Sequence, residues 1–288
     1  MSVVSGISGQ LSTDGTNAAA SVRGWSISYR SNNPAGHASG ASPGMEFNVP
    51  GVKDWEGSFD YYGKFPPVIP GATGAGSTTF IGHTGAKQVT GTILPTAATI
   101  NVDIESGSII GGTVNFVSNS ALVWSATATA LADVSVPSMY PSVGCKAQWA
   151  VAAASPSYAN IADVRTWSLT LACEPKRYAS ADTGGIRKAN PGRKSARVDI
   201  GVYQAALDAF NSPDMLPGTV GGLKLFVDAS TFWELRWATV GEESPSIDIE
   251  GGENGIVSLG FEYTSVASIS AANAYGYIHK PGAVAIWP

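Results

Sequence analysis

A seven-residue motif that occurs twice constrains the fold of this chain more than any other feature. Residues 22–28 read VRGWSIS, and residues 164–170 read VRTWSLT. In both copies large apolar residues alternate with small polar ones, and this period of two is typical of a strand with one buried face. Because aromatic side chains dominate core energetics, we expect Trp25 and Trp167 to be core anchors.

Four further matches follow the motif in the same order in the two halves of the chain. The members of each pair are separated by roughly 140 residues, which is a usual domain length. The matched positions are residues 53–60 and 194–199, residues 79–81 and 225–227, residues 101–105 and 246–250, and the expected core anchors Phe116 and Phe261. Five landmarks in one order indicate a duplicated unit.

The duplication predicts two tandem domains. The expected boundaries are residues 1–134 for the first domain, 135–142 for a linker, 143–270 for the second domain and 271–288 for a C-terminal tail. The 288 residues include 34 Gly and 17 Pro, and only 14% are charged. This composition suits many strands with tight turns better than surface helices. The sequence therefore predicts a mainly β protein built from two β-sandwich or barrel domains.

Each domain is expected to carry at most one flanking α-helix. Residues 202–211 place apolar side chains on one helical face. The corresponding segment of the first half, residues 61–67, contains two prolines that allow at most one helical turn. Strands are expected to resume after these segments, and in the first half they cover residues 77–81, 87–94, 99–104 and 112–118.

A long polar stretch follows the Trp strand in each half, at residues 30–50 and 174–194. Loops of this length in compact domains are usually functional or disordered. Because both halves keep one at the same place, we favour a contact arm, with a solvated loop as the alternative. The candidate contact residues are Arg30, His37, Met45, Lys176, Arg177, Arg187, Lys188 and Arg193.

Two pairs of acidic residues also recur, Asp103 with Glu105 and Asp248 with Glu250. Residues i and i+2 of a strand share one face, so each pair permits the carboxylate couple of a glycosidase. Their occurrence once in each unit is better explained by a symmetric acidic surface.

Motifs for catalysis and cofactor binding are weak. Residues 40–44 match the G-x-S-x-G pattern, but Pro43 follows the serine and lacks the backbone N–H that an oxyanion hole needs. The three histidines form no metal-binding pair. Residues 71–76 are rich in glycine but lack the Lys-Ser/Thr end of a phosphate loop. We therefore expect no enzyme activity, no cofactor and no metal.

The charge and the cysteines limit the partners and the compartment. A net charge of −5 and a pI near 5.2 disfavour a stable hold on nucleic-acid phosphates. No apolar run reaches the roughly 18 residues of a membrane-spanning helix, and the first residues do not resemble a signal peptide. We therefore expect no membrane contact and assembly in a cytoplasm. In that reducing compartment Cys145 and Cys173 are expected to be buried thiols, with a disulfide as the alternative.

The opening of each unit resembles the tail tube proteins of tailed bacteriophages. The first half carries a short strand, an Asp14-Gly15 turn and then Val-x-x-Trp-Ser-Ile-Ser, and the second half repeats the last part as Val-x-x-Trp-Ser-Leu-Thr. The resemblance covers residues 9–116 and 143–263. It implies a β-sandwich with one flanking helix, assembled as stacked rings around a DNA channel. Most members have one such domain and form hexameric rings, so two domains imply three chains in a ring with pseudo-sixfold symmetry.

The resemblance also implies partners and a location. The chain would associate with itself in rings and stacks, and with tape-measure and tail-tip or tail-terminator proteins. Double-stranded DNA would pass transiently and without sequence specificity. The protein would lie in the tail of the virion after assembly in the cytoplasm of a host bacterium. The long stretches at residues 30–50 and 174–194 would reach a neighbouring ring. The four acidic residues would lie either near the lumen or on the outer surface.

Two other classes of protein remain open. A capsid decoration protein or another virion protein could carry the same duplication without forming a tube. A tandem carbohydrate-binding module is the second alternative, because 8 Trp and 10 Tyr provide rings that could stack on sugars.

Overall fold

The computed structural model describes most of the first 241 residues and several strands beyond them. The described ranges are residues 10–15, 22–32, 35–37, 46–48, 51–71, 77–132, 139–151, 157–203, 217–241, 246–248, 256–264, 278–280 and 284–285. For residues 35–37, 46–48 and all those after 241, only the backbone is described. Residues 204–216 are outside this set, so the helix expected at residues 202–211 lies mostly outside the described residues.

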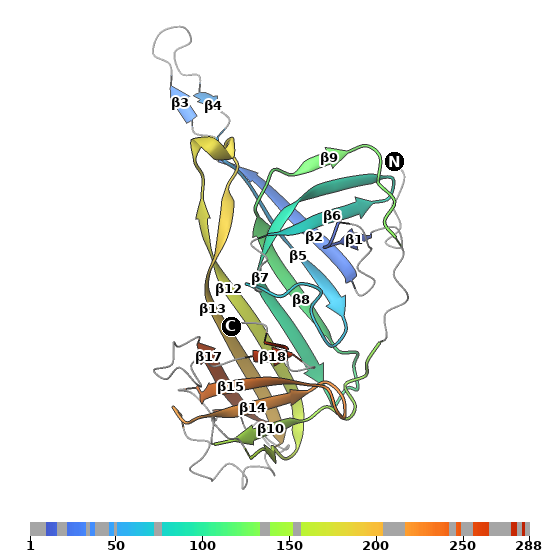
Figure 1. Ribbon diagram of the computed structural model, residues 1–288, viewed down its shortest axis with the longest axis vertical. Coiled ribbons are helices and arrows are strands. Elements are labelled where there is room, and N and C mark those ends of the chain that lie inside the picture. The colour runs from blue at the N-terminus through green and yellow to red at the C-terminus, as the bar shows by residue number, and fades with distance from the viewer. Residues whose placement is uncertain are drawn as a thin grey trace.

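Strands account for almost all regular structure, which confirms the predicted mainly β class (Figure 1). The first half contains β1 (Leu11–Ser12), β2 (Val22–Ser31), β3 (Ala35–His37), β4 (Glu46–Asn48), β5 (Lys53–Tyr62), β6 (Thr78–Thr84), β7 (Lys87–Asp103), β8 (Gly111–Ser118) and β9 (Val123–Ser125). The second half contains β10 (Ala147–Ala150), β11 (Ala159–Asn160), β12 (Val164–Tyr178), β13 (Lys188–Tyr203), β14 (Val220–Phe226), β15 (Phe232–Val240), β16 (Ser246–Asp248), β17 (Ile256–Thr264), β18 (Ile278–Lys280) and β19 (Val284–Ala285). One 3-10 helix, η2 (Ala181–Thr183), lies between β12 and β13.

The strands of the two halves pair in the same order. In the first half the antiparallel order is β2–β5–β8–β7–β6–β1. In the second half β12 pairs with β13, β13 with β17, β17 with both β16 and β15, β15 with β14, and β14 with β10. The counterpart of the single long strand β7 is therefore shared between β15 and β16.

The two halves are joined by strand pairing as well as by the chain. β7 of the first half pairs antiparallel with β12 of the second half, from Asp103 opposite Thr166 to Ala97 opposite Ala172. The strands β2, β5, β8, β7, β12, β13 and β17 consequently form one continuous antiparallel sheet along the length of the molecule (Figure 1).

Shorter strands cover one face of this sheet and enclose two cores. In the first half Phe80 on β6 packs 5.2 Å from Phe116 and 5.8 Å from Trp55 between ring centroids, and Trp25 meets Phe80 edge-on at 5.8 Å. In the second half Trp167 is buried among residues of β13, β14 and β15. The first-half residues Ile100 and Val102 also belong to this second core, because alternate residues of β7 face it.

The expected core anchors differ in burial. Trp167 and Phe116 are both 1% exposed, whereas Trp25 is only partly buried and packs at the edge of the first core. The backbone of Phe261 lies in β17 opposite Val198, and its side chain is outside the described set. Cys145 and Cys173 are both free and buried, and burial raises the pKa of the Cys145 thiol to about 11.

The polar stretch at residues 174–194 is a β-hairpin and not an irregular loop. β12 and β13 continue past the body of the sheet and stay paired from Pro175 opposite Pro191 to Tyr178 opposite Lys188. A two-stranded ribbon satisfies many of its backbone hydrogen bonds between its own strands and needs few buried apolar side chains, so its polar sequence resembles that of a loop. We call residues 174–194 the arm.

The corresponding stretch of the first half contains a second small hairpin. β2 extends to Ser31, and β3 then pairs with β4 beyond the end of the sheet (Figure 1). Arg30 lies in β2 and His37 in β3, while Met45 lies outside the described residues.

Candidate assembly interface

The junction between β7 and β12 is built around an arginine that bulges out of its strand. The register of β12 against β13 shifts between Val164 and Thr166, which leaves Arg165 as the extra residue of a β-bulge. Its guanidinium carbon lies 5.9 Å from the centre of the Tyr203 ring, and its guanidinium forms an ion pair with Glu105. The backbone N–H of Ile104 donates to the carbonyl of Arg165 at 2.8 Å. The contacts of Arg165 with Ile104 and Glu105 thus hold the turn that follows β7 against the start of β12.

The turn after β7 is also stabilised locally. The Asp103 carboxylate accepts a hydrogen bond from the backbone N–H of Ser106 at 3.0 Å, as in an Asx turn. This bond lowers the pKa of Asp103. Desolvation and the neighbouring Glu105 carboxylate raise the pKa of Tyr203. Asp103 and Glu105 therefore have different partners at this turn.

The same arginine construction occurs in the first half, on the opposite margin of the sheet. The register of β2 against β5 shifts between Val22 and Gly24, so Arg23 is the bulged residue. Its guanidinium carbon lies 5.8 Å from the centre of the Tyr62 ring. Among the described residues no carboxylate lies within ion-pair distance of Arg23. Both bulged arginines lie over a tyrosine of the next strand, but only Arg165 has an acidic partner among the described residues.

The uncovered face of the sheet is concave and polar. A cavity of about 640 Å³ lies over β2, β5, β8, β7, β12 and β13. Its lining includes Arg23, Asp60, Asn101, Asp103, Thr113, Ser168 and Asp199. Asp60 accepts a hydrogen bond from the Thr113 hydroxyl at 2.7 Å. Three aspartates and one arginine line this cavity, so it is poorly suited to a tight hold on phosphates.

The arm folds back onto the first half of its own chain. Asp54 on β5 forms ion pairs with Arg177 and Arg187, and its carboxylate accepts a hydrogen bond from the Ser118 hydroxyl at 3.0 Å. Only 17% of the Asp54 side chain is exposed, so these contacts are shielded from solvent.

Backbone hydrogen bonds hold the tip of the arm in the same place. The N–H of Lys53 donates to Gly185 at 2.7 Å, and the N–H of Arg187 donates to Lys53 at 2.9 Å. The N–H of Ala189 donates to the Asn119 side chain at 3.0 Å. The arm is therefore docked at β5 and at the end of β8.

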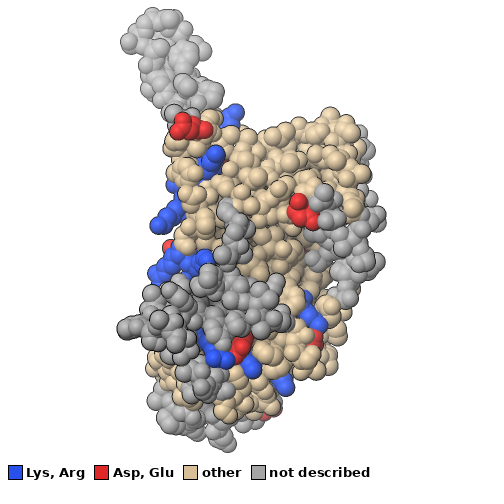
Figure 2. Space-filling view, in the orientation of Figure 1, with Lys and Arg blue, Asp and Glu red and all other residues tan. Residues whose placement is uncertain are grey.

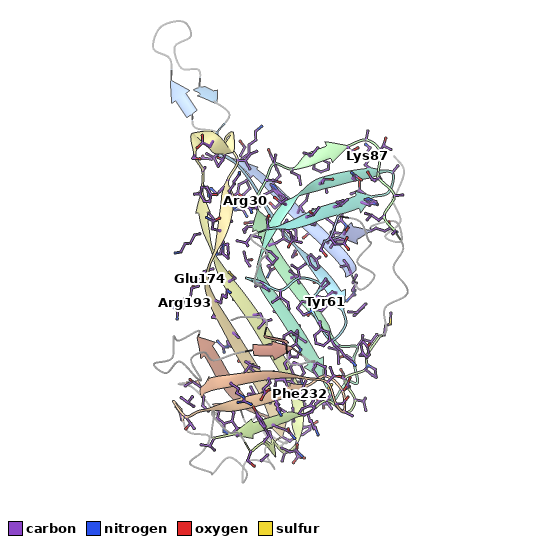
Figure 3. All side chains as sticks on the ribbon, viewed as in Figure 1. Arg30, Tyr61, Lys87, Glu174, Arg193 and Phe232 are labelled. Atoms are coloured by element: carbon purple, nitrogen blue, oxygen red, sulfur yellow. The ribbon has the colours of Figure 1, made fainter. Side chains whose placement is uncertain are left out.

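Not all candidate contact residues take part in this docking. Lys176 and Lys188 lie on the paired strands of the arm, opposite Asn190 and Tyr178. Arg193 and Glu174 lie where the arm leaves the sheet, and Arg193 points away from it (Figure 3). In Figure 2 basic side chains are spaced along the left margin, over the arm, while the face of the first half that is turned to the viewer is largely uncharged. Arg30 pairs with Glu56 on the neighbouring strand.

Of the second acidic pair, only the backbone of Asp248 lies among the described residues. The backbone of Asp248 ends β16, opposite Ile256 of β17, and Glu250 lies outside the described residues. Sequence reasoning missed Asp54, and it did not assign a role to the bulged arginines. The signal for the arginines was present, since both copies of the motif begin with Val-Arg.

Two classes of site are not found among the described residues. These residues contain no group of three or more His, Cys, Asp or Glu side chains that could hold a metal ion. No helix in the described part of the chain is long and apolar enough to cross a membrane.

Comparisons with known proteins give little guidance. No protein-family model matches the chain, and no curated protein matches it. Among solved structures, a chain from the tail of an empty GTA particle, refined helically with C6 symmetry, is similar with a TM-score of 0.35 and 14% identity. The match covers 44% of this chain and 95% of that one. At this TM-score the likeness carries no inference about the present chain.

Proposed function

We propose that this chain is a structural protein of a bacteriophage tail. Three copies close into a ring of six similar domains, and stacked rings form the tube through which DNA leaves the virion. The role is mechanical and requires no catalytic group. The observation that carries the proposal is the β7–β12 junction, where one half of the chain continues the sheet of the other.

The sheet supports ring closure because the two halves of one chain are already joined by the pairing of their edge strands. The second half repeats the strand order of the first and adds to its β7 edge. If the same kind of edge pairing forms between copies, each copy extends the sheet in the same direction. Such a head-to-tail contact produces a closed ring when the rotation from one copy to the next adds up to a full circle. Closure also removes the exposed edges that would otherwise recruit other chains.

The concave polar face supports a role as the wall of a channel. Covered by strands on one side only, the sheet leaves its polar face free to line a lumen. A conduit for DNA needs a wall that does not retain phosphates, and the acidic residues of this face meet that need. Asp103 lies on this face, and the lumen assignment for all four acidic residues is part of the proposal.

The sequence motifs supply the link to tails. The Val-x-x-Trp-Ser strand of each half resembles that of phage tail tube proteins, and the low charge and acidic pI suit a self-associating virion component. In this proposal the ring also contacts tape-measure and tail-tip or tail-terminator proteins, and it assembles in the cytoplasm of the host bacterium.

Negative-stain electron microscopy of the purified protein tests the proposal. Tubes of stacked rings with a central channel are the expected result. Compact trimers that never stack would instead favour a capsid decoration protein. Single particles of one chain that bind glycans on an array would favour the carbohydrate-binding module.

A further inference from the structure

The arm is interrupted at its base and bound to its own chain at its tip. We propose that the arm is a hinged strap, and that its bound tip acts as a latch that holds back the stacking of rings. The latch consists of Lys53 and Asp54 on β5 and of Arg177 and residues 185–187 on the arm. This inference rests on the proposed function and concerns the regulation of the stacking step.

The base of the arm breaks the hydrogen-bond ladder between β12 and β13. The register shifts just before Pro175, so that Gly192 and Arg193 of β13 lie opposite Glu174 alone. An extra residue of this kind is a β-bulge, which bends its strand locally. The next pair is Pro175 opposite Pro191, and neither proline has a backbone N–H to donate to the ladder. The arm is therefore joined to the sheet by a weakened segment that can serve as a hinge.

A glycine marks the position of this hinge. A Cβ atom at Gly192 would lie 2.4 Å from the backbone oxygen of Glu174, so a side chain at this position would force the two strands apart. In Figure 3 the labels of Glu174 and Arg193 lie at the same point, between the body of the sheet and the arm. The bend between the sheet and the arm is thus located at residues 174–175 and 191–193.

The tip of the arm is bound to β5 by a single backbone bridge. Ile186 pairs parallel with Lys53, whose N–H donates to Gly185 at 2.7 Å and whose carbonyl accepts from the N–H of Arg187 at 2.9 Å. β2 occupies the other edge of β5 at this position, and β8 ends before reaching it. The tip therefore fills the place beyond the end of β8, and it can leave without breaking any pair between the long strands.

Two arginines of the arm are occupied by the latch. Arg177 lies on β12 and Arg187 just before β13, and both form ion pairs with Asp54. The Nε atom of Arg177 is buried and has no hydrogen-bond partner among the described residues. A buried donor without a partner lowers the stability of the contact that buries it. The two arginines are thus held within the chain, by a contact that is not optimal.

A contact that exists in the free ring and is lost in the stack opposes stacking. When the tip of the arm binds a neighbouring ring, its bonds with Lys53 and Asp54 are broken. The apparent affinity of one ring for the next is then reduced by the fraction of arms that are already released. The strands that pair within the ring are not part of the latch. The latch therefore delays the growth of the tube without opposing the closure of the ring.

A disulfide that locks the latch tests this inference. Lys53→Cys with Ile186→Cys places two thiols on directly paired residues, and this spacing suits a disulfide. Cys145 and Cys173 are buried and should contribute no background. The oxidised variant should form rings that do not stack, and a reducing agent should restore tubes in the same sample. Negative-stain images before and after reduction measure both properties.

Asp54→Asn tests the opposite direction, because it weakens the latch and keeps the whole arm. Stacking of its rings, followed by light scattering, should be about tenfold faster than in the parent protein. Asp199→Asn is the matched control, since it removes the same charge from the ion pair with Arg197, away from the arm. This control should stack at the rate of the parent protein.

The outcomes separate the latch from the proposed function. Oxidised rings that stack as readily as reduced ones would overturn the latch. Slower stacking of the Asp54→Asn variant would also overturn it, because the next ring would then require a docked arm. In both cases tubes form and the proposed function stands. If the cysteine variant does not fold, the Asp54→Asn variant decides alone. Absence of rings in the parent protein would overturn the proposed function together with the latch.

Discussion

The two bulged arginines are the residues on which the interpretation of this molecule depends most. Arg165 and Arg23 share a bulge and a tyrosine partner, but only Arg165 has a described carboxylate partner, Glu105. In the proposed ring the counterpart of Glu105 would approach Arg23 from the next chain, and by sequence that counterpart is Glu250.

A charge reversal at Arg23 is therefore expected to weaken the ring. Arg23→Glu would face the like charge of the next chain, and such juxtaposition disfavours association. The dissociation constant of the trimer should rise by about tenfold, measured by sedimentation at low salt. Adding Glu250→Arg should restore assembly.

Arg165→Glu is the matched control for this experiment. Its partner Glu105 lies in the same chain, so the melting temperature should fall while the trimer of folded chains persists. If adding Glu250→Arg did not restore assembly of the Arg23→Glu variant, the assignment of Glu250 as the partner of Arg23 would be refuted.

A second residue-scale contact joins the two halves away from the sheet. Lys64 of the first half forms an ion pair with Asp228 of the second, and Phe65 packs 5.6 Å from Trp233. Partial burial acts to raise the pKa of Asp228, but hydrogen bonds from Lys64, Ser230 and Thr231 outweigh it and hold that pKa below its usual range.

The Lys64–Asp228 pair should make stability depend on pH. A carboxyl whose pKa is lowered by folding stabilises the folded chain above the pKa of the unfolded state, about 3.9, and this contribution fades as the pH falls further. Asp228→Asn should therefore cost about 1 kcal/mol at pH 7, after allowance for partial exposure, and progressively less below about pH 4. Chemical denaturation at both pH values measures the difference. An equal loss at pH 7 and pH 3 would contradict this account.

At the scale of elements, strand periodicity was more informative than composition. The alternation in residues 22–28 and 164–170 predicted β2 and β12, and the pairing of their neighbours follows the same order in both halves. Composition misled at residues 174–194, because this ribbon docks mainly through ion pairs and backbone hydrogen bonds and buries too few apolar side chains to produce an apolar period. The expected strands at residues 87–94 and 99–104 are one strand, β7, since the register shift after Pro95 absorbs the missing N–H donor.

The candidate interface was less predictable than the fold. The pairing of β7 with β12 depends on how two distant segments meet in space, and no local pattern encodes it. The Asp54 contacts with Arg177 and Arg187 likewise join residues more than a hundred positions apart. The acidic residues of the repeat were visible in the sequence, but the turn role of Asp103 and the ion pair of Glu105 were not.

The arm is the element whose removal should separate ring formation from stacking. Deleting residues 178–190 takes away the tip but leaves the β12–β13 pairs of the sheet, so the chain should fold and form rings that do not stack into tubes. Circular dichroism and negative-stain images measure the two properties. Tubes of normal length would contradict the assignment of the arm as an inter-ring contact.

Asp54→Asn is the control for the deletion, because this variant retains the whole arm and loses only its contacts with Asp54. The variant loses the ion pairs with Arg177 and Arg187, and hydrogen exchange of the arm amides should become about tenfold faster because charged hydrogen bonds are lost. Rings should still form in this variant.

For the whole molecule the central claim is that one chain supplies two consecutive sixths of a closed circle. Native mass spectrometry of the smallest assembled ring, combined with class averages viewed down its axis, tests it most directly. The account predicts a mass three times the 29.6 kDa of one chain, with six similar lobes around a central opening. A ring of six chains with twelve lobes would contradict it, and so would a protein that stays monomeric.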